Sequence, residues 1–249
     1  MIDPVLLKIG SLEIRYYGIL FALGFLIGYF IIKKIGKEFG FKDEETENLS
    51  IYMVISAIIG ARLFEVLFYD PSYYFSNPIK IFYIWEGGLA SHGALISLIV
   101  FTVLYAKRKK INFYKISDLY IIPISLVAAF VRIGNFINGE LVGKITSVLW
   151  AVKFANYEGL RHPVQFYQSF YYLIIFLILF NLRKIKNYKE GLLFWSFLFL
   201  DGTLRFITEF FKDLPKDYGF YFLGLNLAQY VSLIMILISI IPLYKRFKQ

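Results

Sequence analysis

Seven stretches of nearly uninterrupted apolar residues constrain this chain most. A helix of about 20 apolar residues crosses the hydrocarbon core of a bilayer, whereas the strands of a membrane barrel alternate in polarity over about 10 residues. The pattern therefore predicts an all-α, polytopic membrane protein with about seven transmembrane helices. The predicted spans are residues 16–32, 49–69, 89–106, 117–137, 164–182, 191–211 and 223–243.

The composition supports this class and excludes several chemistries. Of the 249 residues, 58% are hydrophobic and 18% are charged. Because cysteine is absent, the chain has no disulfide, no thiolate metal site and no cysteine nucleophile. His92 and His162 are its two histidines, so a zinc site is not expected. We expect neither a metal nor a cofactor. Residues 1–15 lack a signal-cleavage pattern, so the first span is expected to remain.

The distribution of positive charge predicts the topology. Lysine and arginine are concentrated in the connections after the first, third and fifth spans and after the seventh. Cytoplasmic connections carry such an excess. With an odd number of spans, the N-terminus is then predicted outside and the C-terminus in the cytoplasm.

Two polar segments lie outside the spans. Residues 70–88 are broken by proline and rich in tyrosine and tryptophan, which predicts an arm lying on the membrane surface. Residues 138–163 predict a small extracytoplasmic head. No internal repeat is evident, and we interpret residues 1–249 as a single membrane domain.

Arg132 ends the fourth span, where an ionisable group costs about 3 kcal/mol on insertion scales. No acidic residue lies within its reach on the same helix. Its partner is therefore on another helix, or is Glu140 beyond the helix end, or is an external anion, which we favour. Asn135 and Asn138 either brace the backbone there or contact the ligand.

Polar residues far apart in the sequence share one depth in this topology. The outer half of the membrane receives Tyr17, His92, residues 132–143 and Glu209. This coincidence predicts a single polar site.

Each polar residue also has a structural interpretation. Arg62 and Glu65 are three residues apart on one helix face and are expected to pair. Arg205 lies between Asp201 and Glu209 at spacings of four residues, so that stripe is able to satisfy itself. A hydrogen-bonded structural histidine and an ordinary interfacial tyrosine are the alternatives for His92 and Tyr17. Three glycines, Gly134, Gly139 and Gly143, favour tight turns or close backbone approach.

The run RIGNFINGELVG, residues 132–143, resembles the signature G-R-x-G-N-F-x-N-x-E-x-x-G of the bacterial prolipoprotein diacylglyceryl transferases. Four further segments resemble motifs of the same family in the same order. They are RYYG at 15–18, GGLASHG at 87–93, RHPVQFY at 161–167 and GTLRFITEF at 202–210. The matching segments extend over nearly the whole chain, from about residue 13 to 232.

The resemblance implies a bacterial inner-membrane enzyme with seven spans and the N-terminus outside. It implies transfer of the diacylglyceryl group of phosphatidylglycerol to the lipobox cysteine thiol of a prolipoprotein signal peptide, with release of glycerol phosphate. Nucleic acid has no part in this reaction. By the same resemblance, the catalytic group is His92, Arg132, Arg205 and Tyr17. The substrate-binding group is Arg132, Asn135, Asn138, Glu140, Gly143 and Glu209.

The residue types suit this chemistry. Arginine stays charged and binds phosphate through two parallel donors, so it can hold the anionic lipid and stabilise charge on the leaving phosphate. The substrate supplies the thiol nucleophile, which is consistent with an enzyme that lacks cysteine. The thiol must lose a proton, and His92 is our hypothesis for the base; a phosphate oxygen or another residue is the alternative.

The sequence departs from the family pattern at five positions, Val131, Lys144, Ala94, Gln168 and Asp201. Asp201 stands four residues before Arg205, at a position where the family commonly has a tyrosine. A carboxylate there can pair with Arg205 and compete with phosphate for it. Two other classes remain open. A non-catalytic phospholipid-binding relative would explain the departures. A transporter of organic anions or lipids would also use intramembrane arginines, but predicts repeats that the sequence does not display.

Overall fold

The computed structural model describes residues 3–10, 12–214 and 221–248, and the chain forms two compact units. The larger unit comprises Met1–Ile31 and Asp118–Gln249, and the smaller unit comprises Ile32–Ser117. Helices α1 (Tyr16–Ile35) and α5 (Phe113–Asn138) contribute to both. The interpretation of the chain as one membrane domain stays a prediction, and each unit is described by itself below.

Long helices dominate the described residues, which confirms the all-α, polytopic membrane class. Besides α1 and α5, the long helices are α2 (Asp43–Phe64), α4 (Ser91–Lys109), α6 (Val164–Leu182), α7 (Leu192–Glu209) and α8 (Leu227–Phe247). Five of these seven are long and apolar enough to cross a membrane, namely those within 16–39, 43–69, 113–138, 164–182 and 227–247. The other two, α4 and α7, have 19 and 18 residues but are more polar, and α7 carries Asp201, Arg205 and Glu209.

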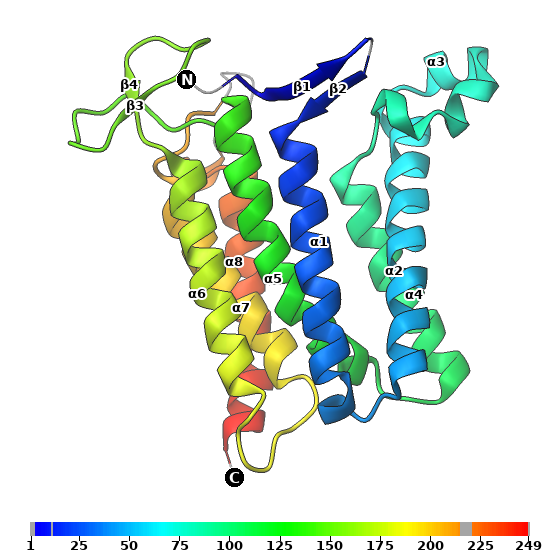
Figure 1. Ribbon diagram of the computed structural model, residues 1–249. Coiled ribbons are helices and arrows are strands. Elements are labelled where there is room, and N and C mark those ends of the chain that lie inside the picture. Colours follow the sequence, from blue (N-terminus) through cyan, green and yellow to red (C-terminus); the bar gives the residue numbers. More distant parts are fainter. Residues whose placement is uncertain (1–2, 11, 215–220, 249) are drawn as a thin grey trace. The chain divides into compact units, whose positions relative to one another are not determined.

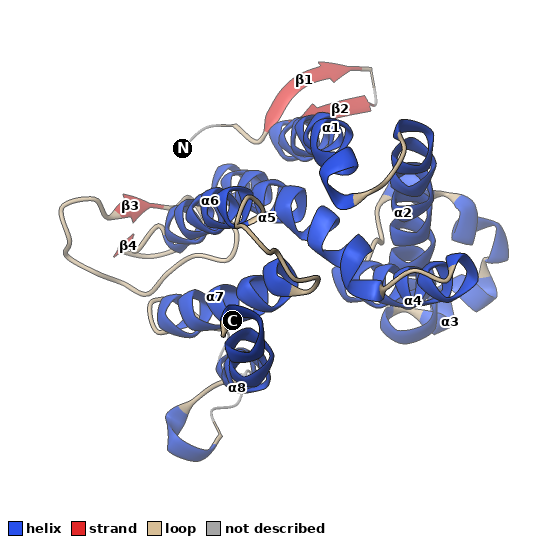
Figure 2. Cartoon of the chain, turned by 90° about the horizontal axis from the view of Figure 1, so that it is seen from below, coloured by secondary structure: helices blue, strands red, loops and turns tan. Residues whose placement is uncertain are grey.

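In the larger unit, two glycines let α1 approach α5 closely. A Cβ at Gly24 would lie 3.4 Å from the Cα of Val127, and one at Gly28 would lie 3.2 Å from the Cβ of Pro123. Gly24 and Gly28 are four residues apart and therefore share a helix face, as in small-residue interfaces between membrane helices. Figures 1 and 2 show the remaining arrangement, with α5 beside α6 and α7 beside α8.

The contact between α5 and α6 is both aromatic and polar. The Phe136 and Phe166 rings lie 4.1 Å apart between centroids, and Ser169 Oγ donates a hydrogen bond to the Ala129 carbonyl at 3.0 Å. Ser169 is buried, so its hydroxyl needs a partner within the protein. The bond to Ala129 supplies that partner and fixes the two helices in register. This register sets the position of the polar residues at the end of α5.

Two small antiparallel sheets lie at the same end of this unit in Figure 1, and neither is predicted from the sequence. The first pairs β1 (Val5–Ile9) with β2 (Leu12–Arg15), directly before α1. The second pairs β3 (Val152–Lys153) with β4 (Leu160–Arg161), within the predicted head. These strands are too short to give a recognisable alternation of polarity. The remainder of residues 139–163 is irregular chain with turns.

A buried carboxylate fixes the opposite end of the unit. Asp118 on α5 accepts hydrogen bonds from the backbone N–H groups of Gly191 and Phe194 and from the Tyr188 hydroxyl. The first backbone N–H groups of a helix lack partners within the helix, so Asp118 caps α7 from another element. The start of α7 is thereby attached to α5.

In the smaller unit, α2 and α4 meet at two glycines. A Cβ at Gly60 would lie 2.6 Å from the Gly93 carbonyl oxygen and would overlap Ser97, and a Cβ at Gly93 would overlap Phe64 and the Gly60 carbonyl. Ser56 and Ser97 donate hydrogen bonds to each other's carbonyls at 3.2 and 2.8 Å. Gly93 is the residue after His92, so this packing fixes the first turn of α4, where the histidine lies.

The predicted arm begins after a π-helical turn, Glu65–Tyr69, and consists of α3 (Pro71–Ser76) and 3₁₀ turns at Pro78–Phe82 and Ile84–Glu86. Its position on a membrane surface stays a prediction. Arg62, 5% exposed, holds the arm against α2. Its guanidinium donates to the Tyr74 hydroxyl at 3.0 Å and to the carbonyls of residues 80, 81, 83, 87 and 88.

The pairing of Arg62 with Glu65 expected from their spacing is therefore wrong. In the described part of the chain Arg62 has no ion pair, because the carbonyls of the arm use its donors. The structural interpretation of this arginine holds, with backbone oxygens in place of a carboxylate.

Candidate active site

The end of α5 carries a chain of polar contacts that begins at Arg132. Its Nη1 donates to Asn135 Oδ1 at 3.2 Å, and Asn135 Nδ2 donates to Glu140 Oε1 at 2.7 Å. Asn138 Nδ2 reaches the same Glu140 oxygen at 3.3 Å. Glu140 therefore acts on Arg132 through the amide of Asn135 and makes no direct ion pair with it. The two asparagines contact side chains here, and their predicted role in binding substrate stays a prediction, as does that of Glu140.

Backbone geometry turns the chain back so that Glu140 faces these amides. Gly139 has φ +67°, a conformation that favours glycine, and the Glu140 N–H donates to the Asn135 carbonyl at 3.1 Å. Gln165, fully buried on α6, donates from Nε2 to the Glu140 carbonyl at 2.6 Å. Gln165 is not among the predicted site residues, although it belongs to the segment RHPVQFY.

Gly143 joins the turn after α5 to the end of α7. A Cβ at Gly143 would lie 2.6 Å from His162 Cβ and would overlap the His162 carbonyl. The backbone of Gly143 forms a β-bridge with Lys212, and the Lys144 N–H donates to the Phe211 carbonyl at 2.8 Å. The glycine thus permits a close approach between two backbones. Its predicted role in binding substrate stays a prediction.

Arg161 reinforces this junction from the predicted head. Its Nη1 contacts Asp213 Oδ2 at 2.5 Å and donates to the Gly143 carbonyl at 3.1 Å. The Arg161 side chain is 9% exposed, so the ion pair is shielded from solvent on one side. The end of α7 and the signature segment are therefore held in one arrangement.

Tyr17 lies directly against the signature segment. A Cβ on Gly134 would lie 2.7 Å from Tyr17 Cδ2 and 3.4 Å from the Tyr17 Cα. The absence of a side chain at Gly134 therefore allows the first turn of α1 to contact α5. The predicted proximity of Tyr17 to the 132–143 segment agrees with this geometry, whereas its catalytic role stays a prediction.

We expect Gly134→Ala to lower the rate of the reaction that the motif resemblance implies by at least about tenfold, because the added methyl group displaces Tyr17 from the site. Peptide-lipidation rates of purified protein measure the effect. Gly18→Ala is the matched control, because a Cβ at Gly18 meets nothing within 4 Å. Equal rates for both variants would contradict the contribution of Tyr17.

The charged residues of α7 do not satisfy one another as closely as their spacing suggests. Asp201 and Glu209 are buried, and Arg205 is half-buried. Among the described residues, neither carboxylate lies within ion-pair distance of Arg205, and that guanidinium has no hydrogen-bond partner. Asp201 interacts with Arg205 and Arg132 at longer range. Glu209 instead pairs with Lys212 at 3.6 Å.

Lys212 brings a third cation to the two arginines. Burial lowers the pKa of its ammonium group, and repulsion from Arg132 and Arg205 lowers it further, while the Glu209 carboxylate acts in the opposite sense. We call Arg132, Arg205, Lys212 and Glu209 the arginine site. Lys212 lies just outside the predicted span 191–211 and is not among the predicted site residues; its position three residues after Glu209 is the signal that could have found it.

His92 belongs to the smaller unit, at the start of α4. Its Nδ1 lies 3.2 Å from the Tyr69 hydroxyl, its ring is 6.2 Å from the Phe64 ring, and its side chain is exposed. The joining of His92 to the arginine site stays a prediction, since the two belong to different units. No group of three or more histidine, aspartate or glutamate residues is placed to hold a metal ion in the described ranges.

The fold and site together define a class, a helical membrane protein whose bundle holds two arginines without an ion pair in the described part of the chain. Such a site suits an anionic substrate within the membrane.

The sequence matches the family model described as prolipoprotein diacylglyceryl transferase over residues 4–245. Similar curated proteins come from Tolumonas auensis (39% identity; 96% of this chain, 93% of the relative), Geobacter sulfurreducens (35%; 96% and 93%) and Bordetella parapertussis (39%; 95% and 92%). Each is named phosphatidylglycerol–prolipoprotein diacylglyceryl transferase. This chain belongs to the prolipoprotein diacylglyceryl transferase family, as its motifs predict.

Proposed function

We propose that this protein transfers the diacylglyceryl group of phosphatidylglycerol to the lipobox cysteine thiol of prolipoproteins. The cysteine sulfur forms a bond to the glycerol carbon of the diacylglyceryl group. The bond from that carbon to the phosphate oxygen breaks, and glycerol phosphate leaves with the electron pair. The thiol proton passes to a base, so the products are a thioether and glycerol phosphate. Membership of the transferase family and the residues of the arginine site support this proposal.

The single observation that carries the mechanism is the state of the two arginines. Arg132 has one hydrogen bond, to a neutral amide, and Arg205 has none among the described residues. Both guanidinium groups therefore retain donors for a phosphate diester, and a phosphate held by both would have its developing charge stabilised as the C–O bond breaks. Glu140 and Asn135 orient Arg132 without neutralising it by direct contact.

In this proposal, the pair of Lys212 and Glu209 contributes to orienting the lipid headgroup. The pair leaves one Glu209 oxygen, Oε2, buried and without a hydrogen-bond partner in the described part of the chain. A buried unpaired carboxylate oxygen is costly, so it is suited to accept a hydroxyl hydrogen bond from the glycerol headgroup of the donor lipid. In this proposal the arginines bind the phosphate and Glu209 orients the headgroup.

The location is proposed to be the bacterial cytoplasmic membrane, with the N-terminus outside and the C-terminus inside. Within the larger unit, both small sheets and the beginning of α1 lie at one end, and the lysine-rich connection between α6 and α7 lies at the other (Figure 1). The positive-inside rule places that connection in the cytoplasm and the arginine site near the outer surface. Exported prolipoproteins would arrive on that side.

His92→Gln tests the proposed general base. We expect the rate of peptide lipidation to fall by roughly 100-fold or more, because proton removal from the thiol loses its acceptor. Phosphatidylglycerol binding should be unchanged, since the variant leaves both arginines intact. His162→Gln is the matched control, because His162 lies in the head and its Nδ1 contacts Tyr167 of α6. Near-full activity of His92→Gln would remove this residue from the mechanism.

Complementation tests the proposed function in cells. Expression of this chain should restore lipoprotein maturation and growth to a bacterial strain depleted of its own diacylglyceryl transferase. Membrane insertion of the chain must be verified in the same cells by immunoblotting. Stable insertion without restored maturation would favour a phospholipid-binding relative that does not catalyse transfer.

A further inference from the structure

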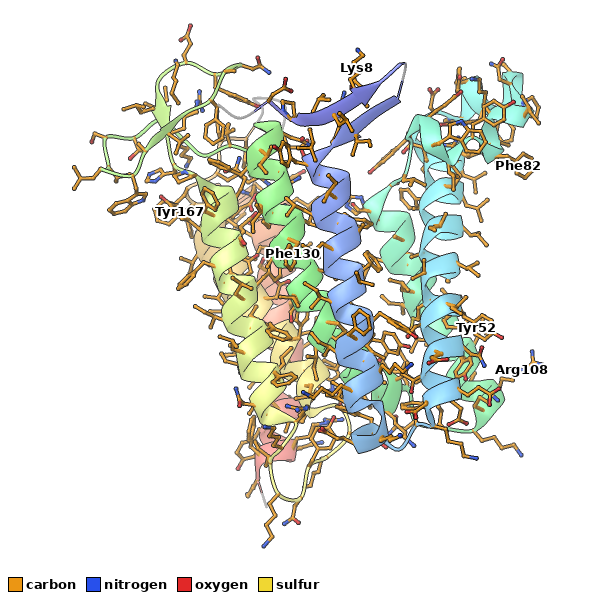
Figure 3. The ribbon with its side chains drawn as sticks, viewed as in Figure 1. Lys8, Tyr52, Phe82, Arg108, Phe130 and Tyr167 are labelled. Atoms are coloured by element: carbon orange, nitrogen blue, oxygen red, sulfur yellow. The ribbon has the colours of Figure 1, made fainter. Side chains whose placement is uncertain are left out.

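A cavity of about 690 Å³, open to the surface, lies in the smaller unit where α2 begins and α4 ends. Figure 3 shows two of its residues, Tyr52 on α2 and Arg108 in the last turn of α4, at the same end of this unit. Its lining includes three large aromatic or apolar residues, Tyr52, Phe101 and Leu104, and three cations, Lys42, Arg108 and Lys109.

The wall of this cavity is aromatic and apolar. The rings of Tyr52 and Phe101 are 6.4 Å apart between centroids, and those of Phe101 and Tyr105 are 5.7 Å apart. Leu104 is 60% exposed. The same two helices pack through glycines at their other end, where no room remains between them. At the cavity end of the contact between α2 and α4, the large side chains of Tyr52 and Phe101 take the place of these glycines and form an accessible apolar wall.

The rim of the cavity carries cations whose donors are free. Lys42, Arg108 and Lys109 are exposed, and within the described ranges none of them forms an ion pair. Glu45 also lines the cavity, and one of its carboxylate oxygens, Oε2, accepts a hydrogen bond from the backbone N–H of Lys42 at 2.9 Å. Glu44 is the other carboxylate of the lining. Three cations and two carboxylates leave a positive balance at the rim.

The position of the cavity restricts its occupant. Here α2 begins and α4 ends, and the basic run 107–110 follows the apolar part of α4. In the predicted topology this end of the two helices lies at the boundary between hydrocarbon and water. An occupant must contact an apolar wall and place an anionic group beside arginine and lysine. A glycerophospholipid with an anionic headgroup meets both requirements, whereas free phosphate meets only the second.

We propose that this cavity binds one anionic phospholipid, with its phosphate at Arg108 and Lys109 and its glycerol and upper acyl chain against Tyr52, Phe101 and Leu104. The assignment of this lipid to the cytoplasmic leaflet rests on the proposed topology. His92 lies at the opposite end of α4, 17 residues from Lys109, or about 25 Å along the helix at 1.5 Å per residue. The bound lipid is therefore remote from the histidine proposed to act on the substrate.

Two double variants of the full-length purified protein test the proposal. Arg108→Gln with Lys109→Gln removes two positive charges that line the cavity. Lys107→Gln with Lys110→Gln removes two charges from the same basic run that do not line it. Native mass spectrometry counts lipids retained during titration with dioleoyl phosphatidylserine, which is anionic but is not the proposed donor. Dioleoyl phosphatidylcholine provides the comparison without net charge.

We expect the cavity variant to lose one retained phosphatidylserine, with apparent affinity at that site about tenfold lower, because two charge-assisted contacts are removed. The matched variant should remain within about twofold of wild type, and phosphatidylcholine should not occupy the site. Equal weakening by both double variants would indicate diffuse surface charge and overturn the proposal. Unchanged binding in the cavity variant, or equal retention of phosphatidylcholine, would also overturn it.

Two further arms separate the sources of the anion and the two proposals. Millimolar inorganic phosphate should leave the phosphatidylserine bound, and its ready displacement would indicate a free-phosphate site instead. Both double variants should lipidate a lipobox peptide at the wild-type rate. Absence of transfer by the wild type would overturn the proposed function. The lipid count by native mass spectrometry would still test the cavity, because it does not depend on transfer.

Discussion

Replacement of Arg132 by alanine is expected to lower kcat/KM for peptide lipidation by about 100-fold to 1,000-fold. The reason is that this guanidinium is fixed by Asn135 and yet has no ion pair within the described residues. Its charge is therefore available to the phosphate in the transition state, and loss of one such group from an enclosed site commonly costs two to three orders of magnitude. Purified protein, phosphatidylglycerol and a lipobox peptide provide the measurement.

Two further substitutions separate charge from geometry at this position. Arg132→Lys keeps the positive charge but loses the planar pair of donors, so its activity should stay close to that of the alanine variant. Arg108→Ala removes an exposed arginine and should retain wild-type activity. Substantial activity in Arg132→Ala would contradict the assignment of this arginine to the phosphate.

The second large effect is expected at Arg62 and concerns stability. Its guanidinium donates to five carbonyls of residues 80–88 and to the Tyr74 hydroxyl, and its carbon Cζ lies 4.7 Å from the centre of the Tyr74 ring. Arg62→Met removes this charged donor from the buried Tyr74 hydroxyl and from five partly buried carbonyls. The expected loss is about 3–5 kcal/mol in the free energy of unfolding, as for other broken buried charged networks.

Thermal unfolding in detergent and limited proteolysis of the arm measure this loss. Arg62→Lys should recover little, because an ammonium group cannot reach carbonyls that surround a planar fork. The exposed Arg108→Met is the matched control for removal of an arginine. An unchanged unfolding midpoint with a protease-resistant arm would show that Arg62 does not hold residues 70–88 in place.

The membrane helices follow from the sequence because apolar length alone determines them. The predicted span 164–182 coincides with α6, one of the five helices that are long and apolar enough to cross a membrane. The predicted span 191–211 differs from α7 by one residue at the start and two at the end, but α7 is too polar to be among those five. Less predictable were the helix ends that carry polar residues. The α2 helix begins at Asp43, six residues before its predicted span, because the Glu45 carboxylate accepts the Lys42 backbone N–H and caps the helix within the polar connection.

The partner of Arg62 could not be predicted from local spacing. Glu65 is the acidic neighbour that helix periodicity offers, but the residues that bind Arg62 lie 12 to 26 positions further along the chain. The carbonyls that accept from Arg62 lie in and beside the 3₁₀ turns of the arm, and only the folded path of the arm brings them to one guanidinium. The same reason explains the missing prediction of Asp118 as a cap for α7.

The arginine site was predictable in part. Motif residues gave Arg132, Arg205 and Glu209, whereas Lys212 and Gln165 depend on how the residues after α5 pack on α6 and α7. Sequence spacing also suggested that Asp201 competes for Arg205, but no ion pair joins them in the described part of the chain. Asp201 therefore makes no direct contact with the Arg205 guanidinium, although its charge acts on that group at longer range.

Transfer itself provides the most direct test of the central claim. The purified chain is mixed with phosphatidylglycerol carrying a radiolabelled acyl chain and with a peptide containing a lipobox cysteine. The account predicts label on the peptide, a mass increase equal to one diacylglyceryl group, and stoichiometric release of glycerol phosphate. A lipobox peptide with serine in place of cysteine should remain unlabelled. Folded protein that binds phosphatidylglycerol but transfers no label to the cysteine peptide, while a known active relative does so in parallel, would contradict the account.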